Sequence, residues 1–395
     1  MSPADESPTL RPLRGPDHRR VLSDALAARA AGEVPLIGDE RWSQEHWQTL
    51  LRSVLGPPLP EDAAWASFTS GSTGRPRAIV RSARSWEVSF PTVDVSLGIQ
   101  DDDAVLIPVH PVSSMATYAV AHAHHRGLPW STPVGARLRA ADLDGPTILH
   151  GTPVHLQETV ELLESGAPTT LRAAFTGGAR LDVGLAARAR SLGLQVVTYV
   201  GAAELSLVAV DTGDGLRPIP EVEVEVRADT LWVRSEQTAL AVLGEGGSFR
   251  RDGSWATVGD RAALSSEGVL SLQGRADDAI LTGGATVVPA DVEAWLESLP
   301  GVRAALVLGE PHPRLGQLVT ACVEPTQDTA LDARVLTAAA RTGLSPAQRP
   351  RKWRLVAELP RTASGKVRRL GSEVAFTLPL AAPAAVTEAA TEAAR

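Results

Sequence analysis

Only two of the 38 Lys and Arg residues in this 395-residue sequence are lysines, Lys352 and Lys366. Lysine is a compact charge on a flexible stem, whereas arginine is a wide planar fork. Lys366 follows a Ser-Gly pair in PRTASGKVRR (360–369), a pattern that favours a loop carrying positive charge to a phosphate or a developing carboxyl oxygen. A surface basic tail is the alternative. Lys352 lies in the basic run RPRKWR, which we interpret as solvated surface.

A second candidate for chemistry is SFTSGSTGRPRAIVRS (67–82), which begins at the end of the apolar segment WASF. Glycines let the backbone turn its N–H groups inward, and the hydroxyls add further donors. A strand followed by such a loop and then a helix-prone stretch predicts a concave anion site. An ordinary Ser/Gly turn is the alternative. The loop is not a Walker motif, because GxxxxGK[ST] occurs nowhere in the chain.

A third segment is GRADDAILTGGATVVPADVE (274–293), in which two acids and a Gly-Gly pair precede a helical pattern. Asp291 and Glu293 fall in the expected first turn of that helix, where negative charge is favourable. We interpret the segment as a linker between two domains that also has a function. A plain linker with ordinary helix capping is the alternative.

The elements that must position these segments change in type along the chain. Residues 21–55 read as helical, and from 64 to about 205 short apolar runs alternate with helical stretches. The runs expected to be buried strands are 147–151, 172–178 and 194–201. This alternation predicts βα units and a largely parallel sheet. From 206 to about 275 the pattern becomes antiparallel, with a turn at Ala228-Asp229, and a compact α+β unit follows.

Composition excludes several functional classes. The net charge is -8 and no basic stripe is interleaved with aromatics, so no nucleic-acid partner is expected. The single cysteine, Cys322, rules out a disulfide framework and a thiolate metal site, and fits a cytoplasmic location. The N-terminus lacks the apolar stretch of a signal peptide. No apolar run reaches the roughly 18 residues of a membrane span.

Four motifs in order give the chain a family resemblance. TSGSTGRPR (69–77), GDRAAL (259–264), GRADDAILTGG (274–284) and PRTASGK (360–366) resemble those of the adenylate-forming superfamily. That superfamily comprises acyl- and aryl-CoA ligases, nonribosomal adenylation domains and firefly luciferase. The resemblance covers about residues 60–372, and the layout resembles that of actinobacterial o-succinylbenzoate–CoA ligases and some short bacterial acyl-CoA synthetases.

The resemblance implies an α/β fold with two domains. A large N-terminal domain has mixed sheets and a β-rich subdomain, and a small α+β C-terminal domain is mobile. With 68 residues before the phosphate loop, the large domain is expected to be truncated at its N-terminus. We expect a flexible arm over 1–20, the AMP-binding domain over 21–274, the mobile domain over 275–377 and a disordered Ala-rich tail over 378–395.

The implied activity is that of an ATP-dependent acid–CoA ligase that forms an acyl-adenylate and then a thioester. ATP, Mg²⁺ and coenzyme A would be used. The nucleotide-binding residues carried over by the resemblance are Thr69, Ser70, Gly71, Ser72, Thr73, Gly74, Arg77, Gly177, Gly178, Ala179, Gly201, Asp260 and Arg275. The first seven would hold phosphates, the next three would form the adenine-side turn, and Asp260 would bind the ribose hydroxyls.

Catalytic roles are implied for three residues. Lys366 would bridge the carboxylate and the α-phosphate, and Glu204 would hold Mg²⁺ together with Thr73. His110, in LIPVHPVSSM, resembles the family's mobile histidine (or aromatic) beside the acid pocket; a structural role, which is the more common one for a lone histidine, is the alternative. Asp277 would be the hinge about which the small domain rotates, and rotation would bring in the Gly283-Gly284 loop for thiol attack.

Some departures from the family keep alternatives open. In VGAAE (200–204), Val200 replaces an aromatic and Ala203 a hydroxyl residue, so a catalytically degenerate nucleotide-binding protein is one alternative. Another is an acyl-AMP ligase that loads an acyl carrier protein. No aspartate occurs between 106 and 116, which argues against an amino-acid substrate. The chain is expected to be a monomer or homodimer. We interpret the histidines at 122, 124 and 125 as helix-end residues rather than metal ligands.

Overall fold

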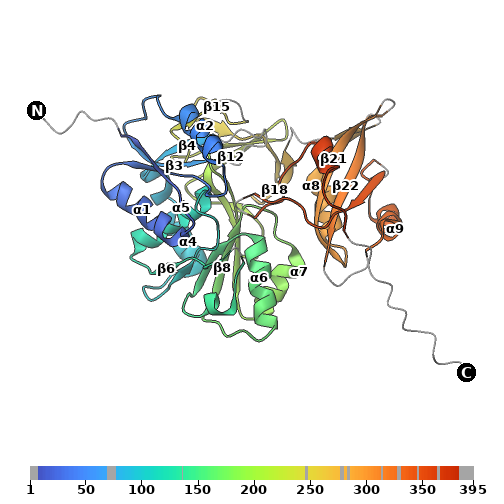
Figure 1. Cartoon of the computed structure of the whole chain (residues 1–395), viewed down its shortest axis with the longest axis horizontal. Helices are drawn as coiled ribbons and strands as arrows, with labels where there is room; N and C mark the ends of the chain where they lie inside the picture. The colour runs from blue at the N-terminus through green and yellow to red at the C-terminus, as the bar shows by residue number, and fades with distance from the viewer. Residues whose placement is uncertain are drawn as a thin grey trace, which may run out of the picture. The chain divides into compact units, whose positions relative to one another are not determined.

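The computed structural model describes residues 8–68, 77–135, 137–244, 248–275, 280–282, 285–312, 315–326, 331–344, 347–362 and 365–381 (Figure 1). The chain divides into two compact units. The larger contains residues 1–272 and 362–366, and the smaller contains 273–361 and 367–395. The first boundary lies two residues before the expected one at 274. In addition, five residues from the expected small domain belong to the large unit.

The N-terminal segment of the large unit forms a mixed sheet, in the order β1-β2-β3-β4-β14. Its strands are β1 (Leu10–Leu13), β2 (Val34–Ile37), β3 (Ala63–Phe68), β4 (Ala78–Ser82) and β14 (Ala241–Leu243), with helices α1 (His18–Ala30) and α2 (Gln44–Val54) between them. The prediction of a flexible arm over 1–20 is wrong for residues 10–13 and 18–20, which lie in β1 and α1, while residues 1–7 lie outside the described part of the chain. The reading of 21–55 as helical also missed β2, which is only four residues long and contains a proline.

A seven-stranded sheet in the order β11-β10-β9-β8-β7-β5-β6 forms the centre of the large unit. Its strands are β5 (Val105–Leu106), β6 (Trp130–Ser131), β7 (Ile148–Gly151), β8 (Ala173–Gly177), β9 (Gln195–Ala202), β10 (Ser206–Asp211) and β11 (Arg217–Pro218). Strands β5 to β9 pair in parallel, which confirms the predicted βα arrangement, and β10 and β11 pair antiparallel.

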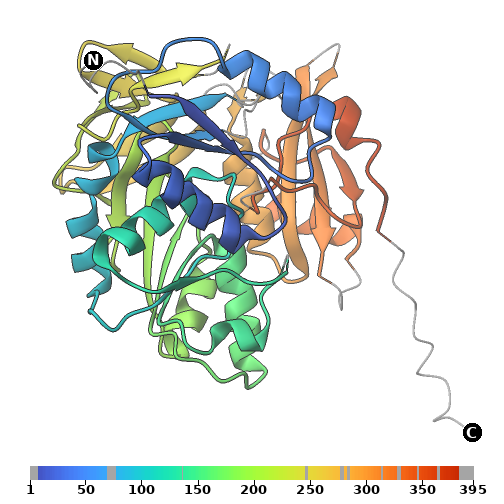
Figure 2. The same cartoon turned by 60° about the vertical axis from the view of Figure 1, so that its left-hand side comes forward.

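Helices cover both faces of this central sheet (Figures 1 and 2). One face packs against α6 (Pro153–Glu164) and α7 (Val183–Ser191), through a core that includes Leu149, Leu156 and Leu185. The other face, which carries Phe175, packs against α3 (Arg84–Glu87), α4 (Phe90–Leu97) and α5 (Ser114–Arg126). A short 3-10 helix spans Ala140–Leu143.

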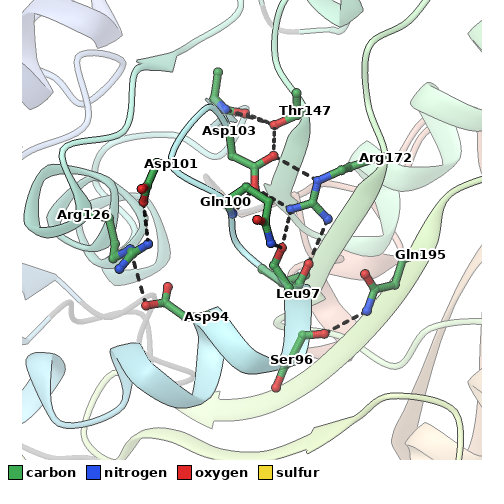
Figure 3. A network of polar contacts seen from close by, with 12 residues as sticks. Asp94, Ser96, Leu97, Gln100, Asp101, Asp103, Arg126, Thr147, Arg172 and Gln195 are labelled. Carbon is green, nitrogen blue, oxygen red and sulfur yellow. Dashed lines mark hydrogen bonds and ion pairs between the residues drawn. The ribbon is translucent and has the colours of Figure 1, made fainter.

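A polar network fastens α4 to the starts of the central strands (Figure 3). Arg172 donates to Asp103 and to the carbonyl oxygens of Leu97 and Gly98, while Thr147 donates to Asp103 at 2.6 Å. Burial of Asp103 would raise its pKa, but the bonds from Arg172 and Thr147 lower it overall. The network therefore fixes the edge of the sheet opposite the carboxyl ends of β7, β8 and β9.

The β-rich part of the large unit forms a third sheet, in which β15-β16-β13-β17-β18 follow one another and β12 pairs with β13. Its strands are β12 (Glu223–Arg227), β13 (Thr230–Arg234), β15 (Arg250–Asp252), β16 (Trp255–Thr257), β17 (Asp260–Leu264) and β18 (Leu270–Arg275). The predicted antiparallel turn at Ala228-Asp229 is confirmed, because both residues adopt positive φ angles of 46° and 62° between β12 and β13.

The small unit is an α+β structure, as predicted. It contains β19 (Ile280–Thr282), β20 (Ala285–Val287), α8 (Pro289–Glu297), β21 (Val302–His312), β22 (Gly316–Pro325), α9 (Ala333–Gly343), β23 (Lys352–Leu355) and α10 (Ser372–Ala375). The disordered tail expected over 378–395 is wrong for residue 380, since Leu380 bridges to Val356. Residues 382–395 lie outside the described part of the chain. Within the described residues, none of the helices has the length and apolar character needed to cross a membrane.

Candidate active site

The loop that carries Lys366 packs with the large unit. The amide of Thr362 donates to the carbonyl of Lys366 at 2.7 Å, and Gly365 turns the chain with a φ of 82°. A methyl group placed on Gly178 would lie 3.1 Å from Lys366 Cε and 3.8 Å from Nζ. The loop thus brings Lys366 to the carboxyl end of β8, beside one of the glycines that the sequence assigns to nucleotide binding.

Gly177 ends β8, and Gly178 and the exposed Ala179 follow in a bend. Gly178 has a φ of 87°, a conformation that favours glycine. The carboxyl ends of parallel strands are where ligands bind in open α/β sheets. The predicted adenine-side turn and Lys366 therefore meet at the edge of the sheet that is suited to a ligand.

Glu204 is presented by the short connection between β9 and β10. A side chain at Gly201 would overlap the carbonyl oxygen of Ser206, so only glycine allows the two strands to approach this closely. Ser206 itself has a φ of 62°. Glu204 is buried, and its Oε1 lies 3.3 Å from Nη2 of the buried Arg77, which directly precedes β4. Two predicted phosphate and metal residues are thus brought together.

Beneath Glu204 lies Arg81, a fully buried residue that sequence analysis did not single out. Its Nε and Nη2 donate to the carbonyl oxygen of Ala203 at 2.8 and 2.6 Å, and its Nη1 donates to that of Gln237. Burial lowers the pKa of Arg81 to about 9, and the negative charge of Glu204 opposes that shift. Its partners are 122 and 156 residues away in sequence, so no local signal identifies them.

Two further predicted nucleotide residues lie in the β-rich sheet. Asp260 begins β17 directly after Gly259, which has a φ of 83° and donates to Thr257 Oγ1 at 3.0 Å. This turn fixes the backbone on which the Asp260 carboxylate stands. Arg275 is the last residue of β18 and belongs to the small unit.

Several predicted residues lie outside the part of the chain that the structure describes. They are Thr69, Ser70, Gly71, Ser72, Thr73, Gly74, Asp277, Gly283 and Gly284. The second lysine, Lys352, begins β23 in the small unit, where its exposed ammonium contacts Glu310 at 2.5 Å.

His110 takes part in a cluster that the sequence did not reveal. Its Nε2 lies 2.8 Å from Glu40 Oε2 and 3.8 Å from Asp39 Oδ1, and its ring packs edge-on against His18. Burial lowers the pKa of His110, although both carboxylates oppose this. Asp39 and Glu40 follow the end of β2. A prediction of this strand from the sequence would have identified them as residues at a strand end.

The donor atoms of His18, Glu40 and His110 lie within 4.8 Å of one another, a spacing compatible with a metal ion. However, Nδ1 of His110 accepts a hydrogen bond from the amide of Val112 at 3.2 Å. A neutral imidazole that accepts at Nδ1 carries its proton on Nε2. Metal-ligating histidines instead donate from the second nitrogen. The geometry therefore favours a hydrogen bond from His110 to Glu40 over metal ligation.

Two of the three histidines of α5, His122 and His125, also have polar or aromatic partners. His122 is buried and its Nε2 contacts Asp94 Oδ1 at 2.8 Å. Asp94 also contacts Arg126 at 3.5 Å, as Figure 3 shows. His125 packs against the ring of Phe90. These contacts tie the C-terminal end of α5 to α4, which agrees with the structural interpretation.

The family has an aromatic residue at the position that Val200 takes in this chain. Tyr199 lies one residue before that position. In β9, Tyr199 pairs with Gly177, and its ring stacks on Phe175 with centroids 4.2 Å apart. Its hydroxyl lies 3.1 Å from His150 Nε2. The ring is thus held against the α5 face of the sheet and does not replace the aromatic missing at Val200.

Comparison with known proteins agrees with the motif order. The AMP-binding enzyme family matches residues 8–239, and the AMP-binding enzyme C-terminal domain matches residues 291–366. An uncharacterized acyl–CoA ligase of Bacillus subtilis (strain 168) is 28% identical over 78% of this chain and 68% of its own length. Feruloyl-CoA synthase of an Amycolatopsis species is 26% identical over 90% of this chain and 77% of its own.

Among solved structures, the o-succinylbenzoate CoA synthetase of Bacillus subtilis in complex with an acyl-adenylate intermediate has a similar fold. It superposes with a TM-score of 0.79 at 20% identity, covering 92% of this chain and 87% of that one. The likeness extends over both units and is a likeness of fold.

Proposed function

Because the chain belongs to the AMP-binding enzyme family and is an AMP-forming acid–thiol ligase, we propose that Lys366, Glu204 and the residues around them carry out its two half-reactions. In the first, a carboxylate oxygen attacks the α-phosphorus of ATP. The new P–O bond gives an acyl-adenylate, and the bond to pyrophosphate breaks. In the second, the thiol of coenzyme A attacks the acyl carbon. A C–S bond forms, AMP leaves with the electrons of the C–O bond, and the thiol proton passes to solvent.

The observation that carries this proposal is the position of Lys366 beside Gly178 at the carboxyl end of β8. A cation there faces both the reacting carboxylate and the α-phosphate, whose negative charges repel each other. Positive charge placed where negative charge develops is among the largest contributions to catalysis. We propose that this arrangement serves the adenylation half-reaction.

Glu204 supports binding of the Mg²⁺ that accompanies ATP. Its buried carboxylate offers the hard oxygen ligand that Mg²⁺ prefers, and its neighbour Arg77 neutralises the charge when no ion is bound. Thr73 is proposed as the second ligand. The ion, when bound, neutralises phosphate charge. Arg77 and the loop 69–74 are proposed to bind the phosphates alongside it.

The remaining nucleotide contacts follow from the family. Asp260 is proposed to accept from both ribose hydroxyls, with Arg275 as a second contact. The segment Gly177–Ala179 is proposed as the adenine side, and Gly201 keeps the Glu204 turn close to β10. Asp277 is proposed as the hinge that exchanges the Lys366 loop for the Gly283-Gly284 loop before thiol attack.

We propose free coenzyme A as the acceptor, with an acyl carrier protein as the alternative. His110 is proposed to act beside the acid pocket, with Glu40 holding its ring in place. A cytoplasmic location is proposed because ATP and coenzyme A are used there. Whether the chain is a monomer or a homodimer would be settled by sedimentation.

The test is acid-dependent exchange of labelled pyrophosphate into ATP, followed by product analysis with and without coenzyme A. Exchange together with acyl-CoA formation is the expected result. Exchange without acyl-CoA formation would indicate that the acceptor thiol of the second half-reaction belongs to a carrier protein. No exchange with any acid, from acetate to long fatty acids and aryl acids, would overturn the proposal.

A further inference from the structure

A wall of packed rings, formed by Tyr199, Phe175 and His150, lies beside the proposed reaction centre. A methyl group on Gly177 would overlap the Cζ end of the Tyr199 ring, so this end of the ring covers the β8 backbone at that residue. The ring also stacks on Phe175, with the two ring planes tilted by 22°. Tyr199 therefore fills the space that a side chain or a ligand would otherwise take at Gly177.

The reacting end of the acid is fixed by the neighbouring glycine. Lys366 Cε and Met115 Cε each lie 3.1 Å from the position of a methyl group on Gly178. Consecutive Cα atoms are about 3.8 Å apart, so the lysine stem and the tyrosine ring lie one residue apart along the chain. An acid whose carboxylate meets Lys366 beside Gly178 would thus bind next to Gly177, the residue that the Tyr199 ring covers.

The interior beyond Tyr199 is closed. The Tyr199 hydroxyl contacts His150 at 3.1 Å, and the His150 ring packs edge-on against Tyr118, whose hydroxyl contacts Ser89 at 2.8 Å. Protein interiors of this kind are close-packed, and side chains yield little to an added group. An acyl chain cannot pass inward between the sheet and α5 along this path.

The wall also carries no charge. Burial lowers the pKa of His150 to about 3 and raises that of Tyr199, so both groups are neutral at physiological pH. Their polar atoms are already bonded to each other. A second carboxylate on the substrate would meet no positive partner there, and burying an unpaired charge is costly.

From this geometry we propose that the enzyme activates short monocarboxylic acids, in the range of acetate to butyrate, and that Tyr199 sets the length limit. This inference rests on the proposed role of Lys366. Because these rings are uncharged, the selection is by size. A single methylene in a hydrophobic pocket changes discrimination by about 10–200-fold.

The first test needs no variant. Pyrophosphate exchange by the wild-type enzyme is measured with straight-chain acids from acetate to dodecanoate and with succinate. We expect kcat/KM to fall at least about 100-fold between butyrate and octanoate, and succinate to be inactive. Equal or better activity with octanoate or dodecanoate would overturn the length limit and leave the ligase function intact. No exchange with any acid would overturn the proposed function, and the limit with it.

Variants then test the assignment to Tyr199. Tyr199→Ala is expected to raise the octanoate-to-acetate ratio of kcat/KM by at least about 10-fold, whereas Tyr199→Phe, which keeps the ring, should keep the wild-type ratio. Trp232→Ala, a truncation of similar size in β13 of the β-rich sheet, is the matched control. If Tyr199→Ala does not fold, Met115→Ala enlarges the same site from the α5 side. An unchanged ratio in a folded Tyr199 or Met115 alanine variant would overturn the assignment.

Discussion

Arg81 donates two hydrogen bonds, at 2.8 and 2.6 Å, to the carbonyl oxygen of Ala203, the residue directly before Glu204. A third bond runs from Arg81 to the carbonyl of Gln237, whose side chain in turn donates to the carbonyl of Leu207 at 3.0 Å. The buried Arg81 cation thus holds the turn between β9 and β10. Glu204, which lies in this turn, pairs with Arg77, the residue before β4.

Arg81→Met should destabilise the large unit substantially. The change leaves the carbonyl groups of Ala203 and Gln237 buried without donors, at about 1–3 kcal/mol each. Urea unfolding measures the loss of unfolding free energy. Arg84→Met is the matched control, because its partner Glu236 is exposed and exposed ion pairs contribute about 0–1 kcal/mol. Equal losses in the two variants would contradict the role of Arg81.

Lys366→Arg should lower pyrophosphate exchange by about 100–1,000-fold while ATP binding is retained, because the wider guanidinium keeps the charge but misplaces it. Lys352→Arg changes the only other lysine of the chain and should leave exchange unchanged. Exchange rates and equilibrium ATP binding are both required. Wild-type exchange in Lys366→Arg would remove this lysine from the mechanism.

Glu204→Gln should raise the Mg²⁺ concentration needed for half-maximal exchange by about 10-fold or more, since an amide oxygen is a weaker ligand than a carboxylate. Exchange is followed across a Mg²⁺ titration at fixed ATP. Glu236→Gln, at an exposed position, is the control and should follow the wild-type curve. The metal assignment fails if both variants respond to Mg²⁺ alike.

Gly201→Ala should abolish activity and destabilise the fold by about 3 kcal/mol or more, because its methyl group would overlap the carbonyl oxygen of Ser206. The backbone atom cannot move aside without opening the β9–β10 pair. Gly135→Ala, where the nearest atom is 3.9 Å away, is the matched control and should be close to neutral. Thermal unfolding compares the two variants, and equal melting temperatures would count against a close approach at Gly201.

Buried neutral histidines should make the enzyme lose stability in mild acid. The pKa of His150 is lowered to about 3 and that of His155 to about 4 by burial, from the usual 6.5. Between these values and 6.5 only the unfolded chain is protonated, so stability is complete above pH 6.5 and falls as the pH drops toward 4.

The variant His150→Gln removes one of these protonation sites. It should reduce the slope of unfolding free energy against pH between 6.5 and 4.5 by up to about 1.4 kcal/mol per pH unit. Urea unfolding over that pH range measures the slope. His124→Gln, at an exposed position of α5, is the control and should keep the wild-type slope. A wild-type slope in His150→Gln would contradict burial of a neutral ring.

Local patterns in the sequence were enough to predict the central strands and the antiparallel turn. Apolar runs marked β7, β8 and β9, and the Ala228-Asp229 pair marked the turn that the positive φ angles require. Short elements were harder to predict. Strand β1 contains a proline and only four residues, and its stability comes from pairing with β2, which no periodicity shows.

The candidate site divides in the same way. Lys366 and Gly178 lie in motifs that the sequence displays, but their proximity depends on where the chain folds back. Arg81 resembles any arginine at the end of an apolar strand until its partners, more than a hundred residues away, are known. The inward direction of Tyr199 follows from its pairing with Gly177, since only a residue without a side chain leaves room for the ring.

Residues 362–366 belong to the large unit, while the residues on either side of them belong to the small one. The polypeptide therefore crosses between the units at three points along the sequence and not at one. A recombination event that exchanges the small unit as one continuous piece would also transplant five residues of the large unit, including Lys366. A hybrid would work only if its new loop fits the surface of the recipient around Thr152 and Val154, which Gly365 approaches. The large unit and the loop 362–366 must therefore evolve together, even though each unit has a core of its own.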